Sequence, residues 1–301
     1  MSIDVHKGLS RPQLINLVLI TIFWGVNWPI MKMAVTEYPP MTFRGLSVVI
    51  GLIFLALYVK MRGIDFRIPR RDWALIVRLS VLNMVVWHVC LMLALPSLNS
   101  GRAAVIGYTM PVFSALWGYV IYKQKITKLH TGCILIAFLG VALLLWEEFS
   151  TLSGAPGAAL TLLFATACWA IGTQQLRRAD TDIHIVTIAF WMTAVTGIAI
   201  FVLALAREPS QWHMPSASVN AAILYNGVIV FAFCHTAWAF LARTLSPVAS
   251  SISISLIPVI GLLSGAYFLN ETLNWQDGIA VVLIGSAIIA TLIPDKPSLA
   301  Q

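Results

Sequence analysis

The sequence predicts an all-α polytopic membrane protein, with ten transmembrane helices arranged as two inverted five-helix repeats. Composition is the first observation: 59% of the 301 residues are hydrophobic and 10% are charged, which is too apolar for a water-soluble protein of this size. The second is a series of apolar runs of about 18 to 22 residues, each long enough to cross ~30 Å of hydrocarbon. The third is an internal repeat, in which residues of the first half recur in the second at an offset of 145 to 148 positions.

The apolar runs place ten spans in order along the chain. They lie near residues 14–33, 42–60, 73–94, 103–122, 130–146, 157–176, 184–206, 218–241, 247–269 and 276–293. The first run lacks the small-residue cleavage site of a signal peptide, so we expect it to be retained. The loops are short and contain no GxxxxGK[ST] phosphate-binding motif, which argues against an ATP-driven pump.

Lysine and arginine predict the orientation of the chain. Loops on the N-terminal side hold fourteen of them, whereas the other side holds only Lys32, Arg102 and Arg207. By the positive-inside rule both termini should be cytoplasmic, and the net charge of +7 needs no nucleic-acid partner. Arg44 and Arg78 lie close to span ends, where we expect their side chains to reach the membrane surface.

The repeat sets the predicted symmetry. Trp24 aligns with Trp169, Phe43 with Phe190, His88 with His235, Pro111 with Pro258 and Gly132 with Gly278. Each half holds five spans, and because five is odd, the second half should enter the membrane from the opposite side. Inverted repeats of this kind are typical of transporters, with the substrate site near the midplane between the repeats.

The closing segment of the chain carries a family resemblance. It reads PVIGLLSGAYFLNETLNWQDGIAVVLIGSAII from Pro258 to Ile289, and Glu271, Leu273, Gly278 and Gly285 stand at the positions of a repeat-closing motif. The chain thereby resembles the EamA family of the drug/metabolite transporter superfamily, with residues 1–147 and 156–294 as its two repeats. The first copy departs from the motif by having Lys125 in place of the glutamate.

This resemblance is strongest to the aromatic amino-acid exporters of the bacterial inner membrane. It implies a central cavity formed by eight helices, with the fifth and tenth spans peripheral. We also expect a small-molecule substrate, a lipid surround and no cofactor, with a monomer sufficient for function and the oligomeric state left open.

One face of the first span carries unusual residues for a membrane helix. Trp24, Asn27, Trp28 and Met31 follow one another at i, i+3, i+4 and i+7, which places them on one side of a helix. Trp24 lies roughly 15 Å into the span, near the bilayer midplane. A buried amide must face protein or a watery cavity, since lipid offers it no partner. Trp28 alone also fits an interfacial anchor.

Prolines predict kinks in these spans. Pro29 should free the carbonyl of Gly25, and Pro111 that of Gly107, because proline lacks an N–H and its ring displaces the preceding turn. Pro258 is the symmetry counterpart of Pro111. Carbonyls freed in this way can accept from a substrate ammonium group, although the kinks could equally serve helix packing alone.

The same reasoning adds candidates from other spans. They are His88 in the third span, Tyr108 in the fourth, Trp169 and Thr173 in the sixth, and His235 and Trp238 in the eighth. A lone membrane histidine is commonly a packed hydrogen-bonding residue, and Tyr108 could be a core aromatic. The symmetric positions of His88 and His235 favour a cavity role.

The acidic residues complete the prediction. All twelve lie in loops or at span edges, which weighs against a drug-cation exporter with a membrane carboxylate. The four cysteines lie in spans at spacings that suit neither disulfides nor a metal site.

We expect an aromatic, uncharged cavity that suits a zwitterion, and hence an alternating-access exporter of amino acids, aromatic ones for preference. The alternatives are a broad drug/metabolite exporter and, from other classes, a membrane scaffold or a membrane enzyme, for which no nucleophile or metal constellation is visible.

Overall fold

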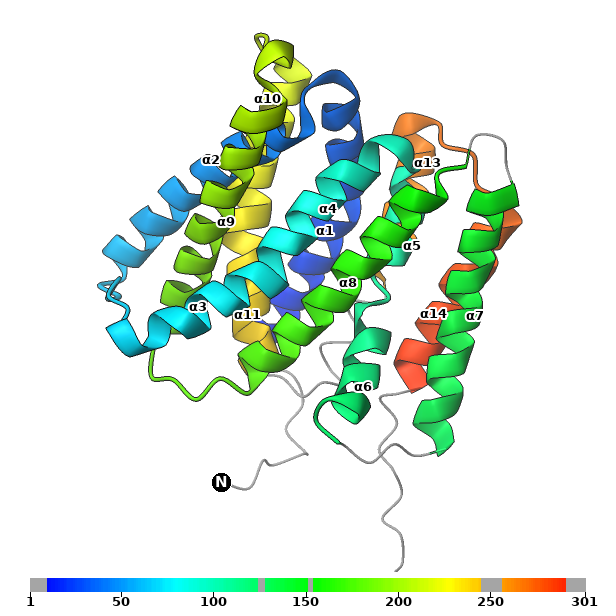
Figure 1. Ribbon diagram of the computed structural model, residues 1–301, viewed down its shortest axis with the longest axis horizontal. Helices are drawn as coiled ribbons and strands as arrows, with labels where there is room; N and C mark the ends of the chain where they lie inside the picture. Colours follow the sequence, from blue (N-terminus) through cyan, green and yellow to red (C-terminus); the bar gives the residue numbers. More distant parts are fainter. Residues whose placement is uncertain (1–9, 124–127, 151–153, 245–255, 291–301) are drawn as a thin grey trace, which may run out of the picture.

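The computed structural model describes residues 10–123, 128–150, 154–244 and 256–290, which are helical with no strand (Figure 1). The helices are α1 (Arg11–Glu37), α2 (Pro40–Met61), α3 (Trp73–Ser80), α4 (Val86–Ala94), α5 (Ser100–Gly107), α6 (Met110–Val120), α7 (Lys128–Ser150), α8 (Pro156–Arg177), α9 (Ile185–Arg207), α10 (Ala217–Tyr225), α11 (His235–Thr244), α13 (Ile257–Leu269) and α14 (Trp275–Ala290).

Eight helical segments in the described residues are long and apolar enough to cross a membrane. They correspond in order to the first eight predicted spans, which confirms an all-α polytopic membrane protein. The ninth predicted span begins outside the described residues, and its described part is the 13-residue helix α13. The tenth corresponds to α14, with 16 residues, and its predicted end and both chain termini also lie outside, as does Lys125. The count of ten therefore stays a prediction.

Local signals explain where several helices begin and end. Ser10 caps α1 in a reciprocal arrangement with Gln13, which satisfies backbone N–H groups that a helix start leaves unpaired. Pro39 and Pro40 separate α1 from α2, with Pro40 at the first helical position, where a missing N–H costs nothing. Asn270 ends α13 in the left-handed conformation, with φ of 53°, as a helix-terminating residue often does.

Two spans contain π-helical segments, Val81–Val85 between α3 and α4, and Asn226–Cys234 between α10 and α11. In a π-helical turn each backbone hydrogen bond spans one residue more than in an α-helix. The side chains that follow such a segment therefore point in a different direction. The two segments occur in the third and eighth spans, which the sequence repeat pairs. Both contribute residues to the cavity described below.

The helices pack as a broad bundle with one separate pair at its edge. Figure 1 shows α7 and α14 side by side on the right. Each of the two contacts the other more extensively than it contacts any other helix. The remaining helices surround the middle of the molecule, with α1 against α13, α2 against α9, and α4 against α8. The peripheral position that the resemblance implied for the fifth and tenth spans agrees with this arrangement.

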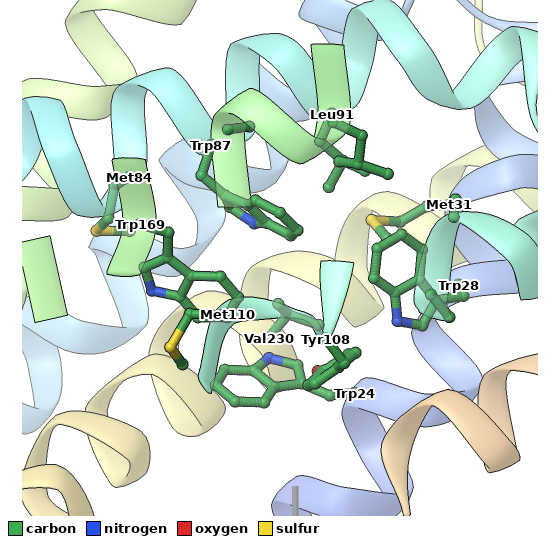
Figure 2. Packing of buried hydrophobic residues seen from close by; sticks show 14 of the residues in the cluster. Trp24, Trp28, Met31, Met84, Trp87, Leu91, Tyr108, Met110, Trp169 and Val230 are labelled. Carbon is green, nitrogen blue, oxygen red and sulfur yellow. The ribbon is translucent and has the colours of Figure 1, made fainter. Parts of the chain in front are cut away.

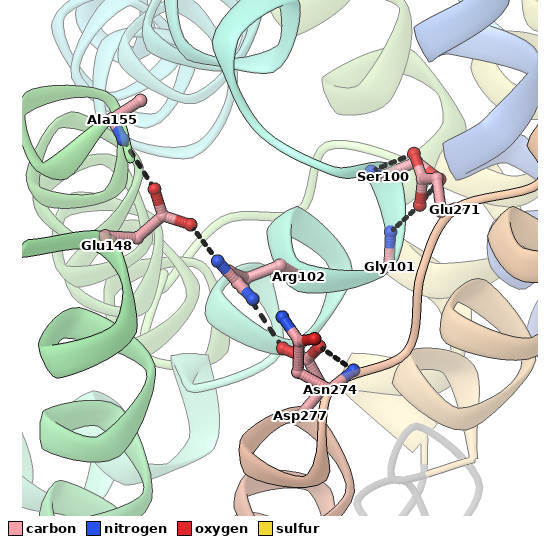
Figure 3. Close-up of polar contacts among 8 residues, drawn as sticks. All are labelled: Ser100, Gly101, Arg102, Glu148, Ala155, Glu271, Asn274 and Asp277. Carbon is pink, nitrogen blue, oxygen red and sulfur yellow. Dashed lines mark hydrogen bonds and ion pairs between the residues drawn. The ribbon is translucent and has the colours of Figure 1, made fainter. Parts of the chain in front are cut away.

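Two carboxylates bind the starts of distant helices at the upper end of the bundle in Figure 1. Glu208, after α9, accepts hydrogen bonds from the backbone N–H of Met41 and Thr42 at 2.8 and 2.7 Å. Glu271, after α13, accepts from the backbone N–H of Ser100 and Gly101 at 2.7 and 3.1 Å (Figure 3). Both place a negative charge at a helix N-terminus, which the helix dipole favours.

A buried arginine ties three further helices together at the same end. Arg102 of α5 donates from Nε to Asp277 of α14 at 3.0 Å and from Nη1 to Glu148 of α7 (Figure 3). Glu148 also accepts from the backbone N–H of Ala155 at 2.6 Å, just before α8. The upper end of the bundle is thus held by buried, charge-assisted contacts, which are stronger than neutral hydrogen bonds.

Candidate substrate cavity

A cavity of about 70 Å³ lies in the middle of the bundle. Its lining comes from α1, α2, α4, α8, α9, α11, both π-helical segments and the turn after α5; no described residue of α7, α13 or α14 lines it. The resemblance implied eight lining helices, and α13 is the one that contributes none, because it packs behind α1 and α5. Ligand sites usually measure roughly 300–1,000 Å³, so a molecule of amino-acid size requires these helices to move apart.

Aromatic side chains form a continuous wall of this cavity (Figure 2). The ring centroids of Trp24 and Trp169 lie 6.5 Å apart, and those of Trp87 and Trp169 lie 4.8 Å apart. Trp28 extends the wall, with its centroid 6.4 Å from those of both Trp87 and Tyr108. Most of these pairs meet edge to face, a favourable geometry for aromatic rings. The wall thus joins indoles from the first half of the chain to one from the second.

All but one of the residues predicted to contact substrate line the cavity. Those that do are Trp24, Asn27, Trp28, His88, Tyr108, Trp169, His235 and Trp238. The exception, Thr173, is buried behind the cavity and donates from Oγ1 to Asn83 Oδ1 at 3.2 Å. It therefore orients the side-chain amide of Asn83, which does line the cavity. That the lining residues bind a substrate stays a prediction.

Several lining side chains carry buried polar atoms without a hydrogen-bond partner in the described structure. They are Asn27 Oδ1, Arg44 Nε, Asn83 Nδ2 and both ring nitrogens of His88. Buried polar atoms are rarely left unpaired, because desolvation without a compensating bond is costly. Their gathering around one cavity indicates a place for a polar ligand or for water.

Arg44 corrects the sequence interpretation. We expected this side chain to reach the membrane surface, but it is fully buried, with 0% exposed, and lines the cavity. Its Nη1 donates to Asn226 Oδ1 at 3.1 Å, and its Nη2 lies 2.7 Å from Met31 Sδ. The cavity is therefore not uncharged as expected. Arg78, by contrast, is exposed.

His88 and His235, which the sequence alignment of the two halves pairs, meet around Phe231. His235 stacks on this ring, with centroids 5.1 Å apart and an interplanar angle of 11°, and His88 lies 4.9 Å from it. The two imidazole centroids are 5.5 Å apart. His235 Nδ1 lies 2.7 Å from the carbonyl oxygen of Val230, so this imidazole has a fixed orientation while His88 has none from hydrogen bonding.

The predicted kink at Pro111 is instead a break between two helices. Helix α5 ends at Gly107 and α6 begins at Met110, with Pro111 in its first turn. A proline is well accommodated at such a start, and the break turns Tyr108 toward the cavity. A Cβ on Gly107 would come within 2.9 Å of Trp87 and 3.0 Å of Trp28, so this glycine is also required by indole packing.

The other two prolines behave differently from each other. Pro29 lies inside α1, which is continuous from Arg11 to Glu37, and Gly25 faces α13, where a Cβ would collide with Ile260. Pro258 stands in the first turn of α13 rather than in mid-helix. Whether these prolines supply carbonyls to a substrate stays a prediction.

Sequence reasoning missed several lining residues, of which Arg44, Asn83 and Trp87 carry polar or aromatic side chains. Asn83 and Trp87 are one helical turn apart and followed by Leu91, so a face with a period near four was present in the third span. Arg44 was missed although a charge within a span is by default a functional candidate. Arg44 is the third residue of the second predicted span, residues 42–60, and this position near the span end led us to expect its side chain at the membrane surface.

Known proteins match the chain along most of its length. The EamA-like transporter family matches residues 12–146 and 156–293. The chain is similar to the uncharacterized transporter YoaV of Bacillus subtilis, with 22% identity over 90% of this chain and 93% of that one. It is also similar to the uncharacterized inner membrane transporter YedA of Escherichia coli, with 24% identity over 94% and 93%.

A solved crystal structure has the same fold. It superimposes with a TM-score of 0.68 and 18% sequence identity, covering 91% of this chain and 96% of the other. At this identity the likeness concerns the fold alone.

Proposed function

Since the chain belongs to the EamA-like transporter family, we propose that it is a secondary transporter that exports amino acids, preferentially aromatic ones, by alternating access. As a multi-pass membrane protein it has a lipid surround, and the proposed partner is a small-molecule substrate. The observation that carries the proposal is the central cavity, whose aromatic wall lies beside unpaired polar atoms. An aromatic amino acid offers a matching pair of surfaces, one apolar and planar, the other polar.

The arrangement of the cavity supports alternating access. The lining extends to Leu176 and Ile185, where α8 ends and α9 begins, at the lower end of the bundle in Figure 1. The upper end is held by the contacts of Glu208, Glu271 and Arg102. A cavity that reaches toward one end while the other is held suits one of the two states that such a transporter must adopt.

An inverted repeat belongs to the same proposal. It is supported by the two separate matches of the family, one in each half, and by the π-helical segments in the third and eighth spans. With both termini cytoplasmic, the lower end of the bundle would face the cytoplasm, and export would start there. The proposed location is the inner membrane of a bacterium, and a monomer is proposed to be sufficient for function.

The main alternative is a broad drug/metabolite exporter that uses the same aromatic wall. No aspartate or glutamate lines the cavity in the described part of the chain, so a cationic drug would lack the carboxylate that normally balances its charge. A scaffold would leave the unpaired polar atoms of the cavity without a purpose.

Flux measurements test the proposal. Purified protein in proteoliposomes should transport labelled phenylalanine and tryptophan faster than threonine, and faster than sugars and cationic dyes. Flux of dyes above that of every amino acid would support the broad exporter instead. An absence of flux for the whole panel, from protein that is folded and inserted, would contradict transport of these classes.

A further inference from the structure

Arg44 is a buried positive charge that has no negative partner among the residues the structure describes. The ion pairs among the described residues are Arg71 with Asp72, and Arg102 with Glu148 and Asp277; none involves Arg44. Glu208 caps the start of the same helix, but its oxygens accept from Met41 and Thr42. An arginine in a membrane span normally pairs with an anion or lines a polar pathway, so the missing partner is one that the described residues do not supply.

The contacts of Arg44 orient the guanidinium without neutralising it. Its Cζ lies 5.6 Å from the ring centroids of both Phe43 and Phe231, and the amide oxygen of Asn226 holds Nη1 at 3.1 Å. Nε has no hydrogen-bond partner in the described structure, and the neighbour of Nη2 is the thioether of Met31, a weak acceptor. One edge of the guanidinium is thus available, and two parallel N–H groups on such an edge fit a carboxylate.

The neighbours of Arg44 suit the rest of an amino acid. Asn27 precedes Met31 by four residues on α1, which places the two about 6 Å apart along the helix. Its unpaired Oδ1 can accept from an ammonium group while a carboxylate lies on Arg44. The indole of Trp28, on the same helix face, offers an apolar surface beside both groups.

We propose that Arg44 is the carboxylate-binding residue of this cavity, so that the site takes apolar monocarboxylates, aromatic amino acids among them, and excludes aromatic amines that lack the carboxylate. The inference rests on the proposed transport function and names the chemical group that the site requires. The proposal assigns different roles to the two charged groups of an amino acid. The carboxylate is essential for binding, whereas the ammonium group only strengthens it.

Binding by the purified full-length protein tests this without relying on flux. Three ligands share the phenyl ring: phenylalanine, 3-phenylpropionate without the ammonium group, and phenethylamine without the carboxylate. Tryptophan fluorescence of the detergent-solubilised protein should respond to the first two, and phenethylamine should bind at least ten-fold more weakly than phenylalanine. Phenethylamine binding as tightly as phenylalanine would overturn the proposal.

Substitution of the arginine provides the second arm. Arg44→Gln should weaken phenylalanine and 3-phenylpropionate about ten-fold or more, as expected for the loss of a charge-assisted pair, and should remove the preference over phenethylamine. Arg44→Lys keeps the charge but lacks the planar fork of the guanidinium. This variant should retain part of the preference for phenylalanine over phenethylamine. Arg78→Gln, at an exposed arginine of α3, is the matched control and should leave all three affinities unchanged. Unchanged carboxylate preference in Arg44→Gln would overturn the assignment; the ligand series on the unaltered protein decides the question if that variant does not fold.

The two proposals fail in distinguishable ways. If monocarboxylates bind in an Arg44-dependent manner but no amino acid is transported, the carboxylate site stands and amino-acid export is wrong. If phenylalanine is transported at equal rates by the unaltered protein and by Arg44→Gln, export stands and the role of Arg44 is wrong.

Discussion

At the scale of single residues, the indoles define what the cavity can hold. Trp24 contacts Trp169, Trp238 and the ring of His235, with centroids 6.5, 6.0 and 5.8 Å apart. A residue with so many aromatic neighbours has little freedom to rotate, so its face is a fixed surface against which a planar substrate can pack.

Replacing these indoles should change substrate preference. We expect Trp24→Ala and Trp169→Ala to weaken phenylalanine and tryptophan export more than threonine export, because an aromatic contact adds about 0.5–1.5 kcal/mol beyond area burial, roughly two- to twelve-fold. Initial rates in proteoliposomes measure this. Trp146→Ala is the control, since this indole of α7 is 69% exposed. Equal losses for all three substrates would reduce Trp24 and Trp169 to packing residues.

At the same scale, His88 and His235 bear on whether transport is coupled to a proton gradient. Their imidazoles are packed around Phe231, and no carboxylate lines the cavity in the described residues to carry a proton. We expect phenylalanine to move down its own gradient without an imposed pH difference. The combined variant His88→Gln, His235→Gln should slow this flux through lost packing without abolishing it, and His213→Gln, at an exposed histidine, should have no effect. Flux that appears only with a proton gradient, and loses that dependence in the double variant, would identify the histidines as the coupling site.

At the scale of helices, close approach decides which segments meet. The π-helical segment Asn226–Cys234 lies against α2, where a Cβ on Gly227 would come within 3.0 Å of the carbonyl oxygen of Ser47 and closer still to Ile50. This contact brings Asn226 within hydrogen-bond distance of Arg44. The glycine and the wider π-helical turn together place the amide that orients the buried charge.

Helix capping by Glu208 makes a prediction about stability. Glu208→Gln should lower the midpoint of thermal unfolding in detergent by a few degrees, since an N-terminal cap contributes about 0.5–2 kcal/mol and this one is charged and buried at 6% exposure. Glu37→Gln is the matched control, because Glu37 is an exposed carboxylate at the same end of the bundle. A midpoint unchanged in Glu208→Gln would mean that solvent satisfies the start of α2 equally well.

At the scale of the whole molecule, the two ends of the bundle differ. Carboxylates that are buried or partly buried hold the upper end in Figure 1, whereas the cavity lining extends to residues near the lower end. If the lower end faces the cytoplasm, the described state would receive substrate from inside the cell, which is the direction that export requires.

Thiol labelling can establish this orientation. In a background without the native cysteines, Met214→Cys in the loop after α9 should react with a membrane-impermeant reagent added to intact cells, because Met214 is 90% exposed at the end predicted to lie outside. Arg67→Cys, exposed at the opposite end, should react only after permeabilisation. The reverse pattern would contradict the positive-inside prediction and with it the proposed direction.

The sequence by itself determined the membrane class, the first eight spans and the family, as well as the face of the first span that lines the cavity. Hydropathy and helical period are local properties, so Trp24, Asn27 and Trp28 could be assigned to one face without knowledge of any other helix. The family match confirms the resemblance read from the segment that begins at Pro258.

Only the tertiary structure decided which side chains share a partner. Nothing local distinguishes Arg44, which is buried, from Arg78, which is exposed, because burial depends on the helices that pack around each residue. The same holds for Glu208, whose partners lie 166 and 167 positions earlier in the chain. Charges and hydrogen bonds act over a few ångströms in space, irrespective of separation along the chain, so the polar chemistry of the cavity became visible only when the helices were assembled.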